Sequence, residues 1–257
     1  MTSLRQRASA ESNRHWQRPL EGRVALITGS GQGLGAATAE VLSQAGAVVI
    51  ATDLVEHLAQ RVATSIQTNG GQAVGLSLDV AQDKRVEEVF DQMFARHARL
   101  DILVNNAGVD VTLPADELSV AQWDHILQVN LRGPFLTSRC ALQFMKRQAS
   151  GHIVNVVSTA AKRAWANASA YHASKWGLLG FSHALHVEAR EYGVKVSAVV
   201  CGGMRTPFVL ERFPELDPDV LQDPRNVAET IRFILTQPAE TVLPEVIVLP
   251  MRETSWP

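Results

Sequence analysis

The sequence predicts an α/β fold in which a doubly wound, parallel, seven-stranded sheet carries three helices on each face. Three observations indicate this fold. Short apolar runs alternate with longer amphipathic stretches along the 257 residues. The runs are almost continuously apolar, which is typical of parallel strands buried on both faces. No linker-like stretch follows residue 22, so the regular strand–helix rhythm favours right-handed crossovers within a single domain.

Each expected strand is a short run rich in Val, Ile and Leu. The strands are expected at 24–28, 47–52, 73–78, 100–106, 152–158, 195–200 and 245–249. The stretches between them repeat apolar residues at helical spacing. The helices are expected at 33–45, 55–69, 82–97, 121–148, 170–192 and 224–236. Gly46 and Gly70 mark two helix ends, and Asp223 and Pro224 provide the last helix with an N-cap and a first-turn proline.

Two segments stand apart from this rhythm. Residues 1–20 are rich in Arg and Ser and contain a single acid, so we expect an N-terminal tail in front of a domain of residues 21–257. A secretory signal does not fit this composition, and an organelle transit peptide is the less favoured alternative. Residues 206–222 are rich in proline and carry apolar side chains, and we expect them to form a mobile lid over the substrate.

Composition argues against several classes of function. The 24 basic and 26 acidic residues leave a formal net charge of -2, which provides no basic field for nucleic acid and no polybasic face for a membrane. No apolar run is long enough to span a bilayer. Cys140 and Cys201 lie far apart in the sequence, so we expect no disulfide framework, no metal site and a reducing, cytoplasmic location.

A glycine-rich loop, TGSGQGLG at 28–35, separates the first expected strand from the first expected helix. Gly29 permits a tight turn, Gly33 lets phosphates approach the backbone, and Gly35 lets the helix pack on the strand. The helix N-terminus offers unpaired N–H groups and a positive dipole to a pyrophosphate. Such glycines alone more often mark a simple turn, but their place directly after a strand favours a dinucleotide.

An acid ends the second expected strand. Asp53 stands where a carboxylate accepts the hydroxyls of an adenosine ribose and repels a 2′-phosphate. No Lys or Arg lies in the glycine loop or follows Asp53 before Arg61, so we expect NAD rather than NADP. The alternative function of Asp53 is to cap the following helix, and the two functions are compatible. Asp79, after the third strand, is expected beside the adenine, and NNAG at 105–108 is expected to leave room for a flat cofactor.

A tyrosine and a lysine share one face of the expected helix 170–192. Tyr171 and Lys175 are four residues apart, which places them side by side. We expect the ammonium, together with a positive nicotinamide ring, to lower the tyrosine pKa from about 10. Ser158 ends the fifth strand and is expected to hydrogen-bond the substrate oxygen. Taken alone, a Tyr–Lys pair of this kind is usually a surface contact.

These motifs, in this order, resemble the short-chain dehydrogenase/reductase family, whose members are single-domain Rossmann-fold enzymes of about 250 residues. The resemblance covers Gly22 to about Val248 and also includes Asn130 in QVNLRGPF. It implies an NAD(P)-dependent oxidoreductase that acts on CH–OH donors. The implied catalytic residues are Asn130, Ser158, Tyr171 and Lys175.

The resemblance also implies a role for each of these four side chains. Tyr171 would act as general base on an alcohol or as general acid on a carbonyl. Ser158 would orient and polarise the reacting oxygen. Lys175 would hold the nicotinamide ribose and tune Tyr171, while Asn130 would anchor a water that connects Lys175 to solvent. The alternative for Asn130 is a residue at a helix kink before Gly133.

The expected cofactor contacts extend along the ends of the strands. They are Gly29, Gln32, Gly33, Leu34, Gly35, Asp53, Asp79, Val80, Asn106, Ala107, Gly108, Tyr171, Lys175, Gly202 and Thr206. One departure from the family pattern is CGGMRT, where Cys201 occupies a position that is usually proline and Gly202 and Thr206 are retained. We expect a looser turn beside the nicotinamide, with Cys201 as a small buried residue rather than a reactive thiol.

The expected substrate pocket is mostly apolar. It comprises Ser158, Trp165, Tyr171, Met204 and Phe208, with Asp110, Val111 and Phe213 nearby. This lining favours an uncharged, hydrophobic secondary alcohol or ketone, including a 3-oxoacyl-type compound. A substrate attached to an acyl carrier stays an open alternative, because three basic residues could serve it: Lys162, Arg163 and Arg205.

The resemblance further implies a homo-oligomer, which we expect to be a tetramer. Its interfaces would involve 121–148, 170–192 and the last strand, with the tail around Trp256 crossing to a neighbouring subunit. Two alternative functions stay open: an NADPH-dependent carbonyl reductase, and a catalytically silent dinucleotide-sensing or scaffold protein. The intact Asn130, Ser158, Tyr171 and Lys175 argue against the silent protein.

Overall fold

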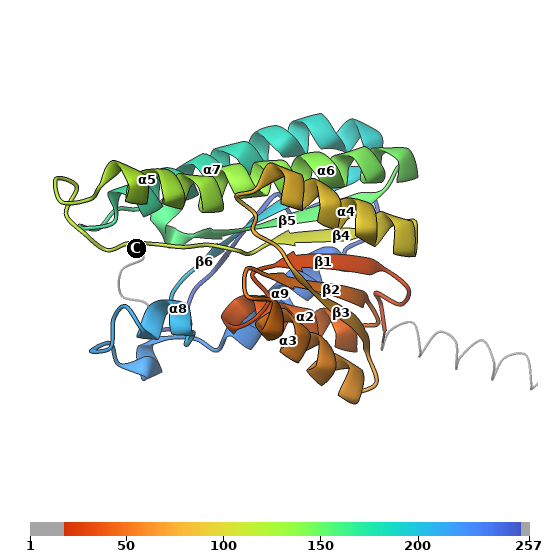
Figure 1. Ribbon diagram of the computed structural model, residues 1–257, viewed down its shortest axis with the longest axis horizontal. Helices are drawn as coiled ribbons and strands as arrows, with labels where there is room; N and C mark the ends of the chain where they lie inside the picture. Colours follow the sequence, from red (N-terminus) through yellow and green to blue (C-terminus); the bar gives the residue numbers. More distant parts are fainter. Residues whose placement is uncertain (1–17, 253–257) are drawn as a thin grey trace, which may run out of the picture.

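The computed structural model describes residues 18–252 and contains a seven-stranded sheet in which every neighbouring pair of strands is parallel (Figure 1). The strands lie in the order β3-β2-β1-β4-β5-β6-β7. Their bounds are β1 Val24–Thr28, β2 Val48–Asp53, β3 Gln72–Ser77, β4 Ile102–Asn105, β5 Gly151–Ser158, β6 Val194–Cys201 and β7 Glu245–Val248. The order reverses between β1 and β4, so this doubly wound sheet has a switch point where ligands bind in such folds.

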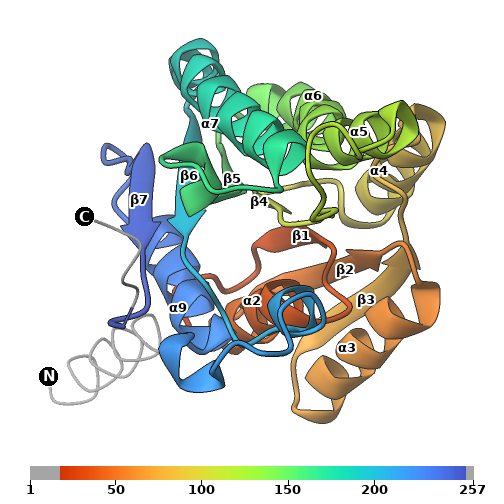
Figure 2. The ribbon, with the colours of Figure 1, turned by 90° about the vertical axis from the view of Figure 1, so that its left-hand side faces the viewer.

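Helices cover both faces of the sheet (Figure 2). The longer helices are α2 Gly33–Gln44, α3 Glu56–Thr68, α4 Asp83–His97, α5 Val120–Leu127, α6 Gly133–Gln148, α7 Ser169–Ala189 and α9 Pro224–Leu235. Figure 2 shows α2, α3 and α9 on one face and α4, α6 and α7 on the other, with α5 beside α6. The expected arrangement of three helices on each face is thus confirmed.

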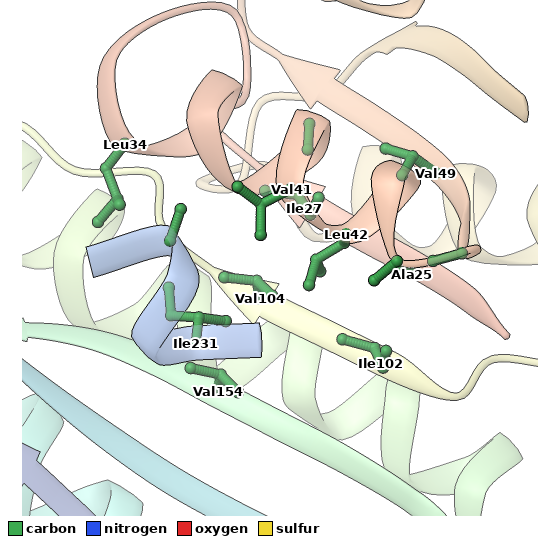
Figure 3. Packing of buried hydrophobic residues seen from close by; sticks show 14 of the residues in the cluster. Ala25, Ile27, Leu34, Val41, Leu42, Val49, Ile102, Val104, Val154 and Ile231 are labelled. Carbon is green, nitrogen blue, oxygen red and sulfur yellow. The ribbon is translucent and has the colours of Figure 1, made fainter. Parts of the chain in front are cut away.

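The sequence of β1, VALIT, explains why it lies at the centre of the sheet. All five of its residues are buried, and successive side chains point to opposite faces. Ala25 and Ile27 belong to the apolar cluster under α2 and α9, which Figure 3 shows from close by. Val24 and Leu26 belong to the cluster under α4 and α6. An uninterrupted apolar run is therefore what a strand with a core on each face requires.

The expected helix 121–148 is three elements in the structure. A π-helical turn at Gln128–Arg132, which contains Asn130, separates α5 from α6. Pro134 lies in the first turn of α6, where its missing N–H leaves the preceding ladder incomplete. The single continuous helix was thus wrong in detail, and the kink expected at Asn130 takes the form of a π turn. Such turns are frequent at functional sites.

The ends of the chain differ in part from expectation. Leu20, assigned above to the tail, is buried in the core and its N–H donates to the carbonyl of Ala45. The packed part of the chain therefore begins before residue 21. Residues 1–17, which make up most of the expected tail, and 253–257, which include Trp256, lie outside the described residues.

The segment expected to form a lid contains two short elements. They are α8, Pro207–Leu210, and the 3₁₀ turn Pro218–Val220. Met204 bridges to Gln222 and so joins the two ends of the segment. Among residues 18–252, no helix is long and apolar enough to cross a membrane.

Candidate active site

One large cavity opens at the carboxyl ends of the central strands. Its volume is about 1570 Å³, and it extends from Asp53 at the end of β2 to Phe208 in α8. Single small-molecule sites usually occupy about 300–1,000 Å³. The cavity can therefore hold a long ligand such as a dinucleotide together with a second, smaller molecule.

Most residues expected at the cofactor and the substrate line this one cavity. They are Gly29, Gln32, Gly33, Leu34, Asp53, Asp79, Val80, Asn106, Ala107, Gly108, Ser158, Trp165, Tyr171, Lys175, Gly202, Met204, Thr206 and Phe208. Gly35 and Asn130 lie behind the wall. A Cβ at Gly35 would be 2.1 Å from the carbonyl oxygen of Gly29, so this glycine permits close packing between α2 and its own loop, as expected.

The N-terminus of α2 faces the cavity without a cap. Its N-cap residue, Gln32, makes no side-chain hydrogen bond, and the first turn contains no acidic residue. Gly33, the first residue of α2, has a φ of 56°, a left-handed conformation that glycine adopts without strain. These bare N–H groups at the positive end of a helix fit the pyrophosphate of a dinucleotide.

The glycine loop is held against the NNAG segment. The hydroxyl of Thr28 accepts hydrogen bonds from the N–H groups of Asn106 and Ala107 at 3.0 and 3.1 Å. The amide of Asn106 donates to the carbonyls of Thr28 and Gly29 at 3.0 and 2.8 Å. A Cβ at Gly29 would lie 2.8 Å from the Cα of Ala107. The two loops that form the floor of the cavity therefore hold each other in place.

Asp53 does not cap α3, whose N-cap residue is Val55, and its contact with a ribose stays a prediction. Its Oδ2 accepts from the N–H of Gly31 at 2.9 Å and its Oδ1 from the N–H of Val55 at 3.0 Å. The carboxylate thus braces the glycine loop and the turn into α3 while it lines the cavity. Its neighbours in the cavity wall, Leu54 and Leu58, are apolar. A ligand at the β2 end of the cavity therefore meets one carboxylate surrounded by apolar side chains.

Tyr171, Lys175 and Ser158 meet in the opposite half of the cavity. Burial raises the pKa of Tyr171 to about 12, although a hydrogen bond with Ser158 acts in the other direction. Burial lowers the pKa of Lys175 to about 8. The Nζ of Lys175 donates to the carbonyl of Val156 at 2.9 Å and lies 5.7 Å from the centre of the Tyr171 ring.

The expected lowering of the Tyr171 pKa by Lys175 together with a nicotinamide ring stays a prediction, and in the chain alone burial acts in the opposite direction. The phenol and the ammonium are both buried, and removal from water penalises the charged form of each. Desolvation is the largest influence on both pKa values. Residue types and spacing cannot reveal this, because desolvation depends on everything packed around the pair.

Asn130 is fully buried and connects the loop after β4 to α7. Its Oδ1 accepts from the N–H of Val109 at 2.8 Å, and its Nδ2 donates to the carbonyl of the same residue at 2.8 Å. The Nδ2 also donates to the hydroxyl of Ser174 at 3.1 Å, and that hydroxyl donates to the carbonyl of Tyr171 at 2.8 Å. The water-holding function expected of Asn130 stays a prediction.

The segment that contains α8 lines the half of the cavity that contains Tyr171. Arg212 forms an ion pair of 2.7 Å with Asp110, which follows the NNAG segment. The guanidinium carbon of Arg212 lies 3.5 Å from the centre of the Phe208 ring, and that ring is 6.1 Å from the Tyr171 ring. Phe213 also lines the cavity, whereas Val111, expected beside it, is not part of the wall.

Sequence reasoning missed Arg212. Its partner Asp110 is 102 positions away along the chain, so no local pattern connects the two residues. Leu54, Val55 and Leu58 were likewise overlooked beside Asp53, although an apolar stretch directly after that acid could have indicated them.

The basic residues considered for an acyl-carrier substrate, and Cys201, differ in whether they reach the cavity. Arg163 lines the cavity, whereas Lys162 pairs with Glu245 at 2.6 Å and Arg205 donates to the carbonyl of Leu221. Cys201 is buried in the wall, and burial raises its thiol pKa to about 12. This agrees with a packing residue rather than a reactive thiol.

His172 fixes the loop that follows Ser158. Its Nδ1 donates to the carbonyl of Ala160 at 2.8 Å, because its Nε2 accepts from the N–H of Trp165 at 3.2 Å. The Trp165 and His172 rings meet edge to face at 4.3 Å. Trp165 lines the cavity and stays 42% exposed, and its contact with a substrate stays a prediction.

Comparison with known proteins gives concordant results. The family model described as short chain dehydrogenase matches residues 23–217. The cis-4-hydroxycyclohexanecarboxylate dehydrogenase of Sinomonas cyclohexanicum is 33% identical over 88% of this chain and 94% of its own length. The D-threitol dehydrogenase of Mycolicibacterium smegmatis is 39% identical over 70% of this chain and 69% of its own length.

A solved structure shares the fold as well as the sequence pattern. A metagenomic short-chain oxidoreductase, crystallised in complex with NADP, superposes with a TM-score of 0.81. It is 32% identical to this chain and covers 90% of it, while 98% of that structure is matched.

Proposed function

Because this chain belongs to the short-chain dehydrogenase family and is an NAD(P)-dependent oxidoreductase, we propose that it transfers a hydride between NAD and a hydrophobic secondary alcohol or ketone. The observation that carries the proposal is the single cavity. One end presents the open N-terminus of α2 and the carboxylate of Asp53, and the other presents Ser158, Tyr171 and Lys175. A dinucleotide along its length would bring its nicotinamide end toward Tyr171.

We assign the proton transfer to the phenol of Tyr171. In alcohol oxidation its oxygen takes the hydroxyl proton, and in ketone reduction it returns that proton. Ser158, which hydrogen-bonds Tyr171, donates to the same substrate oxygen and stabilises negative charge that develops there. The bound nicotinamide supplies or accepts the hydride.

We assign to Lys175 the stabilisation of the negatively charged phenolate form of Tyr171. Burial holds the pKa of Tyr171 at about 12, so the reactive phenolate needs a positive charge nearby. The Lys175 ammonium, 5.7 Å from the ring centre, is the charge that this helix supplies. Asn130 supports α7 through Ser174, whose hydroxyl donates to the carbonyl of Tyr171. We also assign to Asn130 the water that leads from Lys175 to solvent.

We propose NAD as the preferred coenzyme, with NADP as the alternative. A 2′-phosphate on the adenosine ribose would meet the Asp53 carboxylate and the apolar side chains of Leu54 and Leu58. Asp53→Asn removes the charge and keeps a side-chain acceptor for the loop. It should shift the ratio of NADH to NADPH affinity, measured by fluorescence titration, about tenfold toward NADPH. The control Glu56→Gln neutralises a nearby exposed acid and should leave that ratio unchanged.

The deciding experiment is a substrate panel. Secondary alcohols of graded size are incubated with NAD or NADP, and the formation of reduced coenzyme is followed by absorbance. We expect turnover of at least one compact secondary alcohol with NAD. A chain that binds NADH and converts no alcohol or ketone would instead be a silent dinucleotide sensor or scaffold, and tighter binding of NADPH would favour a carbonyl reductase.

We further propose a cytoplasmic homotetramer with 206–222 as the lid of each subunit, whose domain includes Leu20 and so begins before residue 21. An apolar groove formed by Leu127, Leu131, Phe135 and Phe181 on α5, α6 and α7 supports subunit pairing. The free buried thiols of Cys140 and Cys201 support a reducing compartment.

A further inference from the structure

The substrate end of the cavity contains a buried ion pair that the proposed hydride transfer does not require. The side chains of Asp110 and Arg212 are 7% and 21% exposed, and the Oδ2 of Asp110 lies 2.7 Å from the Nη1 of Arg212. The second amino group of Arg212 donates to the carbonyl of Phe208. The flat guanidinium stacks on the Phe208 ring at 3.5 Å. Both terminal nitrogens of Arg212 therefore already donate to the chain.

Asp110, in contrast, keeps one oxygen unused. Its Oδ1 is buried and has no hydrogen-bond partner among residues 18–252. Burial raises the pKa of Asp110, while Arg212 and the N–H of Val111 act in the other direction. That N–H does not meet the geometry of a hydrogen bond to Oδ1. A buried acceptor without a partner is unfavourable, and in native proteins such atoms usually await a ligand or a water.

The position of this carboxylate is fixed, and it is close to the reacting groups. The preceding residue, Val109, is held by two hydrogen bonds from the side chain of Asn130. The charge of Asp110 raises the pKa of Tyr171, and that of Arg212 lowers it, so the pair and the phenol share one end of the cavity. Around them, Phe208 packs with Ala160, Ala168 and Tyr171 in an apolar cluster.

We propose that the Oδ1 of Asp110 accepts a hydrogen bond from a second hydroxyl of the substrate. The inference rests on the proposed function and narrows its substrate class to compact, largely apolar alcohols or ketones that carry a second hydroxyl group. A site built to bond a hydroxyl discriminates strongly against an analogue that lacks it. A carboxylate is disfavoured in the same place, because Asp110 already neutralises Arg212 and would repel a second anion.

The test compares cyclohexanol with the cis and trans isomers of 1,2-, 1,3- and 1,4-cyclohexanediol and with 4-hydroxycyclohexanecarboxylate. The quantity measured is kcat/KM with saturating coenzyme. We expect the wild-type protein to prefer at least one diol over cyclohexanol by about tenfold, well beyond the twofold statistical advantage of two hydroxyls. In Asp110→Ala this preference should fall to the statistical value.

A second variant keeps the test decisive if Asp110→Ala folds poorly. Asp110→Asn preserves shape but, when its oxygen accepts from Arg212, presents an NH₂ donor to the substrate. In the reduction direction, the ratio of kcat/KM for a hydroxyketone to kcat/KM for the corresponding diketone should fall in this variant. Both compounds carry their two oxygens at the ring positions of the diol that the wild type prefers. Glu87→Gln is the matched control, because it breaks an exposed ion pair of 2.6 Å with Arg139. It should leave every ratio unchanged.

The outcomes separate the two proposals. No turnover of any alcohol or ketone would refute the proposed function itself. Turnover of cyclohexanol as efficient as that of every diol, or a diol preference that survives in Asp110→Ala, would overturn the inference and leave the oxidoreductase intact. A preference for the carboxylate would also overturn it, because Arg212 would then be the recognition group.

Discussion

At the scale of single residues, desolvation dominates the electrostatics of the candidate site. Tyr171 and Lys175 are 8% and 4% exposed, and burial moves their pKa values in opposite directions, to about 12 and about 8. Each shift favours the neutral form. The chain therefore holds a neutral phenol beside an amine of lowered pKa, and we expect the positive nicotinamide ring of the oxidised coenzyme to be needed for phenolate.

Replacement of Tyr171 by Phe tests the proton-transfer assignment. The variant keeps the ring that packs on Phe208 and loses only the hydroxyl. We expect kcat to fall by about 100- to 10,000-fold, the usual contribution of a general acid or base, with NADH affinity within about threefold of wild type by fluorescence titration. A variant that retains the wild-type rate on any substrate would refute the mechanism.

Replacement of Lys175 by Met tests the buried charge through stability. The folded pKa of about 8 lies below the ordinary value of 10.5. The cost of the buried charge is therefore fully present below pH 8 and vanishes as pH rises past about 10.5. We expect the change in melting temperature, variant minus wild type, to be more positive at pH 7 than at pH 10 in paired scanning fluorimetry. Equal differences at the two pH values would contradict a depressed lysine pKa.

At the scale of elements, the site depends on contacts between loops that follow different strands. The glycine loop after β1 is held by the NNAG segment after β4. The continuation of that segment is held from the π turn by Asn130. The α8 segment, at the left-hand side of Figure 1, is joined to the same continuation by Arg212 and Asp110. Rigid strands thus position loops, and the loops carry the chemistry.

Replacement of Arg212 by Met tests the attachment of the lid. The variant keeps apolar contact with Phe208 but leaves the buried carboxylate of Asp110 without its partner. Loss of a charged hydrogen bond of this kind shifts an opening equilibrium by roughly 10- to 100-fold. We expect thermolysin to cleave within 206–222 correspondingly faster under native conditions. Arg232→Met, which breaks an exposed pair with Glu229 at 2.7 Å, should leave the cleavage rate unchanged.

At the scale of the whole molecule, the winding of the sheet decides where the cavity forms. The strand order reverses between β1 and β4, so the crossovers on either side diverge and leave a crevice at the carboxyl ends of the strands. Apolar clusters on both faces of the sheet hold these strands in place. Away from this cavity, the outer surface of α5, α6 and α7 carries the apolar groove that contains Phe135.

Replacement of Phe135 by Asp tests the proposed assembly. Phe135 is 47% exposed in the single chain and lies edge to face against Phe181 at 6.2 Å. We expect the wild type to have a mass of four 28.0 kDa chains by light scattering, and a charge in the groove to yield a smaller species. Phe135→Leu should retain the wild-type mass. A wild-type monomer would refute the tetramer.

Much of the fold and of the candidate site could be predicted because it depends on local pattern. The run VALIT followed by TGSGQGLG places a buried strand before an uncapped helix, and the acid at Asp53 follows the neighbouring strand. In a parallel sheet these positions meet at one edge. That Trp165 lines the same cavity likewise followed from its place after Ser158, while its contact with a substrate stays a prediction.

Other features could not be predicted because they arise between distant parts of the chain. The π turn around Asn130 involves hydrogen bonds to Val109, 21 positions earlier. Leu20 joins the core through a bond to Ala45, although its local composition indicates a tail. Neither partner is visible in the periodicity of the segment itself.

The sequence by itself determined the order of the strands and helices, the glycine loop and the set of reactive side chains, because period and spacing are properties of neighbouring residues. Only the tertiary structure decided the sign of the Tyr171 pKa shift and the pairing of Asp110 with Arg212 across 102 positions. Both depend on which distant side chains pack together and lose contact with water, and that is defined only after the chain has folded around the cavity.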